Sequence, residues 1–290
     1  MPVVFAAVLP HGWLLIPALD PSAGGALATR AALGVVERRV TALGVDVVVV
    51  VTPHGIRVDG MVALASTARA AGTLRHAGRV VETNVDLDGP LTEAIAAAAH
   101  ARSVPVAMVG FAGNSWAESA VPLDWGTMVP LWFLGHGRSA PGRGDVLADP
   151  PEMPQSPAVV IAAPSRVLPR ERLVTFGEAL TEAAARDVRR IAVVASCDWA
   201  HTHVGGRYGE SPAARAVDAA VVAALEAGDP RRLLTLTAED IERAAVDGLW
   251  QALVLAGVLA RTPMVGGVLS YEVPPAYATG MVVAAYEPAG

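Results

Sequence analysis

The feature that most constrains the fold is a series of short, almost unbroken apolar runs, rich in valine, that alternate along the chain with amphipathic, alanine-rich segments. Runs without a polar face are typical of strands buried on both sides, and the segments between them are typical of helices that cover a sheet. The sequence therefore predicts a single-domain α/β sandwich with a mixed, mainly parallel sheet covered by helices. Strands are expected at 3–9, 45–52, 104–111, 158–163 and 191–196, and helices at 25–43, 91–101, 170–186, 212–226 and 238–261.

Shorter runs bounded by glycine and proline are expected to form edge or antiparallel strands. They lie at 61–64, 80–83, 265–271 and 280–286. No linker, charge block or repeat divides the 290 residues. The one loosely composed stretch, 135–157, is short enough to be a connection inside a domain. We therefore expect one domain over 1–290.

The composition excludes several classes of protein. With Cys197 as its single cysteine, the chain has no internal disulfide and no multi-thiolate metal site, so a bound metal needs nitrogen and oxygen ligands. A net charge of -6 without clusters of basic residues argues against a protein that binds nucleic acid or anionic lipid.

No membrane span or secretion signal is expected either. The apolar stretch 249–260 has twelve residues, whereas a membrane-spanning helix needs about 20. The start, MPVVFAAVLPHGW, lacks a basic n-region, so a cytoplasmic location is the default expectation.

Three histidines stand where expected strands end. His11 and His54 each lie in a PHG motif after a strand, and His201 lies five residues beyond another. Proline stiffens the exit from a strand, glycine lets the backbone turn, and the carboxyl ends of parallel strands form the crevice where ligands bind. We expect two imidazoles to be presented from adjacent strand tips, with His201 near them. The histidines expected at the surface are His76, His100 and His136.

Two imidazoles and a carboxylate form the facial arrangement that suits Fe(II) and leaves positions open for substrate and oxygen. The favoured carboxylate is Asp247, because it enters an otherwise apolar helix, where a buried charge is costly unless a cation compensates it. An exposed first-turn carboxylate, stabilised by the helix N-terminus, is the alternative interpretation. The other candidates are Glu210, Glu242 and Glu272.

Six motifs together resemble a known family. They occur in the same order as in the catalytic LigB-type subunit of class III extradiol ring-cleavage dioxygenases and in its relatives in the Memo-like group. The motifs are LPHG, TPHG, LDWGTMVPLWFL, ASCDWAHTH, DGLWQALVLAGVL and SYEVPPAYATGMVVAAY. The resemblance covers nearly the whole chain, and the order of the motifs makes it specific.

The resemblance implies a ligand set. His11 and His54 match the two metal-binding histidines of the family. Asp247 falls about where relatives carry the third ligand, a Glu in many dioxygenases and a Cys in Memo-like proteins; a shift of one position would put Val246 or Gly248 there. The implied cofactor is non-haem Fe(II), or another divalent metal. The implied substrates are O2 and a catechol-like or aminophenol-like aromatic compound.

His201 matches the acid/base histidine of the family, and an imidazole suits that role because it titrates near neutral pH. His203 is expected on the same side if the segment is extended. Asp124 or Asp198 could hold a ligand imidazole in its tautomer. The alternative for Asp124 is to cap a helix that begins near Gly126.

The aromatic pocket is expected to involve tryptophans. Trp125 and Trp199, with Trp132, could line it beside His203, although tryptophan at such positions is more often part of the core. Where the family motif D-H-G-x-x-V-P-L has a second catalytic histidine, this chain has Trp125, and Cys197 replaces a glycine. These departures favour a second hypothesis, a Memo-like metal-binding protein without ring cleavage.

A zinc or metal-free hydrolase is a third hypothesis, although the chain has no G-x-S-x-G or H-E-x-x-H motif. The apolar content would allow a homodimer.

Overall fold

The run of five valines forms β2, Val47–Val51, at the centre of the molecule. Its odd-numbered valines pack into one hydrophobic cluster and its even-numbered valines into another, because successive side chains of a strand point to opposite faces of the sheet. All five side chains are fully buried. The computed structural model describes residues 2–111, 115–137 and 156–289, so most of the loosely composed stretch 135–157 lies outside the described residues.

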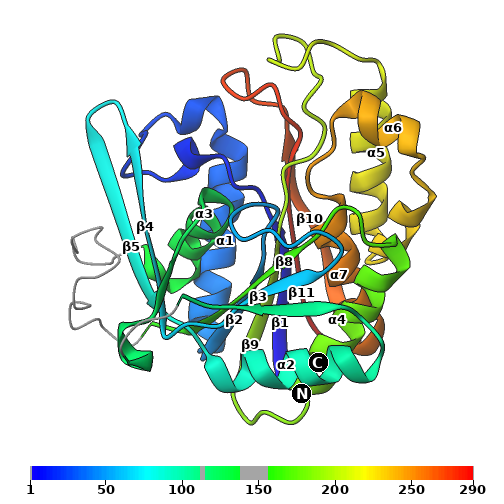
Figure 1. Ribbon diagram of the computed structural model, residues 1–290. Helices are drawn as coiled ribbons and strands as arrows, with labels where there is room; N and C mark the ends of the chain where they lie inside the picture. The colour runs from blue at the N-terminus through cyan, green and yellow to red at the C-terminus, as the bar shows by residue number, and fades with distance from the viewer. Residues whose placement is uncertain (1, 112–114, 138–155, 290) are drawn as a thin grey trace.

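The main sheet has eight strands in the order β10-β11-β1-β9-β2-β8-β3-β6 (Figure 1). The four pairs β1–β9, β9–β2, β2–β8 and β3–β6 are parallel, and the other three pairs are antiparallel. The remaining strands of this sheet are β1 Val3–Leu9, β3 Val62–Ala65, β6 Val106–Val109, β8 Ala158–Pro164, β9 Ile191–Ser196, β10 Met264–Glu272 and β11 Met281–Pro288.

A smaller sheet in the order β5-β4-β7 packs beside the main one (Figure 1). Its strands are β4 Arg69–His76, β5 Arg79–Asp86 and β7 Ala120–Pro122. The cluster that contains Val48 and Val50 also includes Ala70 of β4 and Val85 of β5. This sheet therefore helps to cover one face of the main sheet.

Helices cover both faces of the main sheet. On the face shared with the small sheet lie α1, Leu27–Leu43, and α3, Trp125–Leu131. The opposite face is covered by α2 Gly89–Ala101, α4 Arg170–Ala184, α5 Ala213–Glu226 and α7 Leu249–Arg261, with α6 Ala238–Ala244 beside α5 (Figure 1). The predicted α/β sandwich with a mixed, mainly parallel sheet is confirmed.

Two glycines let α4 and α7 approach each other closely. A Cβ atom at Gly177 would lie 1.9 Å from the carbonyl oxygen of Val254, and one at Gly257 would lie 2.0 Å from that of Val174. Any larger residue would push the helices apart.

The continuous helix expected over 238–261 is wrong. The chain forms α6 and α7 separately, because Ala245 adopts a left-handed conformation with φ 48° and ends α6. Residues 245–248 therefore form a turn that brings Asp247 to the carboxyl end of the sheet. Strands β4 and β7 were not anticipated.

Short helical turns complete the described chain, at Trp13–Leu15, Ala23–Gly25, Trp116–Glu118, Trp132–His136 and Pro230–Thr235. Among the residues with described structure, none of the helices combines the length and the apolar character needed to cross a bilayer.

Candidate metal centre

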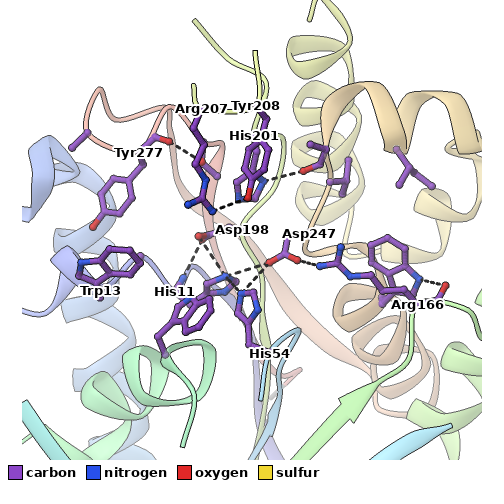
Figure 2. Close-up of a pocket in the computed structure, with 18 of the residues that line it drawn as sticks. His11, Trp13, His54, Arg166, Asp198, His201, Arg207, Tyr208, Asp247 and Tyr277 are labelled. Carbon is purple, nitrogen blue, oxygen red and sulfur yellow. Dashed lines mark hydrogen bonds and ion pairs between the residues drawn. The ribbon is translucent and has the colours of Figure 1, made fainter. Parts of the chain in front are cut away.

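Three side chains meet at the carboxyl end of the sheet (Figure 2). His11 lies two residues beyond β1, His54 lies three residues beyond β2, and Asp247 comes from the turn before α7. One ligand atom of each lies within 4.8 Å of the others. The expectation that the two PHG motifs follow adjacent strands is wrong, because β9 lies between β1 and β2.

The spacing of these ligand atoms fits a small divalent cation. His11 Nε2 lies 3.3 Å from His54 Nε2 and 3.3 Å from Asp247 Oδ2, and His54 Nε2 lies 3.6 Å from the same oxygen. Neighbouring ligands that stand about 2.1 Å from an octahedral ion lie about 3 Å apart. The three atoms therefore form one triangular face of such an arrangement, with the cavity side open.

The His11 ring is oriented by Ser196, the last residue of β9. The Ser196 hydroxyl lies 2.5 Å from the Gly126 carbonyl oxygen, to which it donates, and 3.1 Å from His11 Nδ1. Since a hydroxyl has one proton to donate, Ser196 accepts a hydrogen bond from Nδ1–H of His11. In the neutral imidazole of His11 the lone pair is then on Nε2, which faces the cluster. Sequence reasoning missed Ser196, although its position at the end of a buried strand was visible.

Asp198 supports His11 in a different way from the one expected. Its Oδ1 accepts the backbone N–H of His11 at 3.0 Å, and its Oδ2 lies 3.5 Å from His11 Nε2. Asp198 thus fixes the backbone of the ligand residue and adds negative charge beside the cluster, while the tautomer is set by Ser196.

His54 packs against Trp125. The two ring centroids are 4.1 Å apart at 33°, and Trp125 is 39% exposed along the cavity wall. The backbone of α3 comes close to this pair, because a Cβ atom at Gly126 would lie 3.1 Å from His54 Cδ2. Trp125 therefore covers one face of the His54 ring.

Asp124 caps α3. Its carboxylate accepts hydrogen bonds from the Thr127 N–H at 3.0 Å, the Thr127 hydroxyl at 2.8 Å and the Thr52 hydroxyl at 2.9 Å. The capping interpretation of Asp124 is therefore the one that the structure supports, and no hydrogen bond to an imidazole is among its contacts in the described residues.

Asp247 is buried, with 7% of its surface exposed, so the exposed first-turn alternative is wrong. Its second oxygen, Oδ1, pairs with the guanidinium of Arg166, which follows β8. Arg166 stacks over the Trp250 ring at 4.8 Å, and Trp250 Nε1 donates to the Arg166 carbonyl oxygen at 3.1 Å. Sequence reasoning missed Arg166, which shares with the histidines a place just beyond a buried strand.

The charges in the cluster favour a cation. Burial raises the pKa of Asp247, but His11, Arg166 and His54 outweigh it and hold that pKa at about 2. Burial would lower the pKa of His11, yet the carboxylates of Asp198 and Asp247 raise it overall. Burial and then His11 lower the pKa of His54. At neutral pH the cluster thus presents an ionised carboxylate and a neutral His54 imidazole, which are the ligand forms that metals bind.

The other candidate carboxylates lie elsewhere. Glu272 accepts the Thr29 N–H at 2.6 Å, and exposed Glu210 accepts the Gly205 N–H at 3.3 Å. Glu242 lines the cavity but is not part of the cluster that the described residues form.

His201 lies in the cavity wall above the cluster (Figure 2). Its Nδ1 is 2.7 Å from the Trp199 carbonyl oxygen and 3.0 Å from that of Ala245. Because carbonyl oxygens only accept, Nδ1 carries the proton and Nε2 has the free lone pair. The ring also makes an edge contact with Tyr208, with centroids 5.8 Å apart.

Two residues expected in the pocket are placed elsewhere. Trp199 is fully buried in the hydrophobic core. His203 is also buried, and its Nε2 lies 2.7 Å from Asp218 Oδ2. Neither residue lines the cavity beside the cluster. The segment after β9 is not a strand, so the two-residue alternation that would have put His203 beside His201 does not apply.

The histidines expected at the surface differ from one another. His100 is exposed and His76 is half-buried, but His136 is only 3% exposed, so the expectation is wrong for His136. Burial lowers the pKa of His136 to about 4.

The cluster opens into a cavity of about 570 Å³. This volume lies within the usual range for sites that bind small molecules. Five aromatic side chains contribute to its wall, namely Trp13, Trp125, Tyr208, Trp250 and Tyr277.

An α/β sheet with two imidazoles and a carboxylate converging at its carboxyl end defines a candidate mononuclear metal-binding protein. Residues 5–282 match the family described as the catalytic LigB subunit of aromatic ring-opening dioxygenase, and the chain belongs to that family.

The chain is similar in sequence to one bacterial protein and in fold to another. It is 24% identical over 229 residues to a Clostridium acetobutylicum protein named CA_C1420, a match that covers 78% of this chain and 45% of the relative. The chain thus spans less than half the length of that relative. Among solved structures, its fold is similar to that of the uncharacterized protein JW3007 from Escherichia coli K12, with a TM-score of 0.52, 15% identity and coverage of 97% and 99% of the two chains.

Proposed function

We propose that this chain is a non-haem Fe(II)-dependent extradiol ring-cleavage dioxygenase that acts on a catechol-like or aminophenol-like aromatic substrate. The observation that carries the proposal is the convergence of His11 Nε2, His54 Nε2 and Asp247 Oδ2 on one point. Two imidazoles and one carboxylate suit Fe(II) and leave coordination positions open, and another divalent metal would use the same ligands. Membership of the aromatic ring-opening dioxygenase family supports this choice.

The residues of the cavity have distinct roles in this proposal. Bound iron supplies a Lewis-acidic site at which substrate and O2 are brought together. His11, His54 and Asp247 hold the iron, and the aromatic wall orients the substrate ring and excludes water. His201, whose Nε2 carries the free lone pair, accepts a proton from a substrate hydroxyl and returns it later.

We further propose that residues 1–290 act as one LigB-type domain in the cytoplasm. Its partners are O2 and a small aromatic compound destined for catabolism, without nucleic acid or membrane. A homodimer fits the apolar composition.

The test is anaerobic loading with Fe(II), followed by addition of air and a panel of catechols and aminophenols. Oxygen uptake and the visible absorption of ring-opened products are measured together. We expect activity with at least one compound, and loss of both activity and iron in His11→Ala and His54→Ala. His100→Ala, which alters an exposed histidine of α2, is the matched control. Iron-loaded protein that consumes no oxygen with any compound would contradict the proposal.

The role of His201 has a separate readout. His201→Ala should keep its iron but lose about 10²- to 10⁴-fold in kcat, the usual contribution of a positioned acid or base. Loss of iron in this variant would instead make His201 part of the metal site.

A second candidate function is metal binding without ring cleavage, as in the Memo-like group. Trp125, whose ring packs on His54, favours it, because the resemblance in sequence puts Trp125 where the family motif has a second catalytic histidine. Stoichiometric metal without substrate-dependent oxygen uptake would support this alternative.

A further inference from the structure

We propose that Arg166 is a positioning residue that restricts Asp247 to one ligand oxygen, an inference that rests on the proposed metal site. A carboxylate can bind a cation through one oxygen or through both. The two oxygens of Asp247 have different partners, and Arg166 accounts for the difference.

The partners of Asp247 divide cleanly between its oxygens. Oδ2 faces the imidazoles, at 3.3 Å from His11 Nε2 and 3.6 Å from His54 Nε2. Oδ1 points the other way and pairs with the Arg166 guanidinium (Figure 2). An oxygen engaged by a guanidinium has less freedom to turn towards a cation on the opposite side.

Arg166 is itself held in place. Its guanidinium lies over the Trp250 ring at 4.8 Å, and its carbonyl oxygen accepts the Trp250 Nε1–H at 3.1 Å. Its neighbour Ser165 accepts the Gly60 N–H at 3.0 Å just beyond β8. A planar guanidinium fixed in this way presents a directed donor, whereas a lysine would present a flexible point charge.

Binding of Asp247 through one oxygen leaves more coordination positions free on the cavity side of the cluster. A carboxylate that bound through both oxygens would occupy a further coordination position, one that substrate and oxygen need under the proposed function. With Oδ1 held by Arg166, that position stays available. Under this proposal Arg166 acts on the metal through Asp247, the residue that its guanidinium contacts.

The experiment uses Co(II) alone as the probe. Its visible absorption depends on the number and arrangement of ligands, and its affinity is measured by competition with a chelator. In Arg166→Met, which keeps a long apolar stem against Trp250, we expect a changed Co(II) spectrum and about a 10- to 100-fold change in affinity, the size of effect that removing a partner of a ligand usually has. Arg166→Lys, which keeps the charge without the planar fork, should also change the spectrum and serves if the methionine variant does not fold.

A double-mutant cycle shows whether Arg166 acts through Asp247. In an Asp247→Asn background, Arg166→Met should change Co(II) affinity by less than about threefold, because the oxygen it would release is no longer a carboxylate oxygen. Thermal unfolding of the metal-free variants reports on the fold independently of the metal.

The inference is overturned if Arg166→Met and Arg166→Lys leave the Co(II) spectrum and affinity as in the wild type, or if Arg166→Met changes the affinity equally in the Asp247→Asn background. In either case, Co(II) binding by the wild-type protein would still support the proposed metal site, and only the role of Arg166 would be lost. If the wild-type protein binds no Co(II), both the role of Arg166 and the proposed metal site are overturned.

Discussion

Ser196→Ala should weaken metal binding although Ser196 is not a proposed ligand. Its hydroxyl joins His11 Nδ1, at 3.1 Å, to the Gly126 carbonyl oxygen, at 2.5 Å, and it is fully buried. Alanine would leave the imidazole free to rotate and to carry its proton on Nε2, the atom that faces the cluster. Removing such a partner of a metal-binding histidine costs about 10- to 100-fold in affinity, which is about 1.4 to 2.8 kcal/mol.

The same change should lower the free energy of unfolding. The ring Nδ1 of His11 and the Gly126 carbonyl oxygen would both be buried without a partner, at about 1–3 kcal/mol each, or roughly 2–6 kcal/mol together. Ser119 offers a matched control, because its buried hydroxyl accepts the Ala68 N–H at 2.9 Å and donates to the Trp116 carbonyl oxygen at 2.6 Å. Ser119→Ala should lose similar stability without weakening the metal site.

Two measurements test the effects of Ser196→Ala on stability and on metal affinity. Urea unfolding of the metal-free proteins gives the stability, and anaerobic Fe(II) titration against a chelator gives the affinity. The proposed role of Ser196 is refuted if Ser196→Ala binds Fe(II) as tightly as the wild type, or if Ser119→Ala loses as much affinity as Ser196→Ala.

Other perturbations give further expected outcomes. The pKa of His136 is about 4 in the fold against 6.5 ordinarily, so the free energy of unfolding is highest above pH 6.5 and falls by about 3 kcal/mol as the pH falls towards 4. Urea unfolding at pH 7 and pH 4.5 should show this loss, and His136→Asn should reduce it. Gly177→Ala would place a Cβ 1.9 Å from the Val254 carbonyl oxygen and should lower the free energy of unfolding by about 1–3 kcal/mol or more. Gly34→Ala, whose Cβ would have its nearest contact at 3.6 Å, is the control and should keep the wild-type stability. Equal melting temperatures for the two variants would contradict this expectation. Trp125→His should raise oxygen uptake if the missing histidine limits proton transfer, and an unchanged rate would exclude that cause.

The strands were the most predictable part of the fold. The expected bounds of β1 and β9 match the structure, because strands buried on both faces leave unbroken apolar runs. The break between α6 and α7 was not predictable, since Ala245 adopts a left-handed conformation that sequence patterns associate with glycine or asparagine. The order of the strands was equally hidden, because pairing of β9 between β1 and β2 depends on contacts across the whole chain.

The candidate site was predictable only in part. His11, His54 and Asp247 could be anticipated because their positions combine strand ends, turn residues and an isolated charge in an apolar segment. Ser196 and Arg166 could not, since their importance lies in which side chains the fold brings beside them.

The most direct measurement is a crystal structure of protein loaded anaerobically with Fe(II), with anomalous data collected at the iron absorption edge. We expect one iron bound by His11 Nε2, His54 Nε2 and Asp247 Oδ2. Iron-saturated crystals in which these three atoms contact no metal would contradict it.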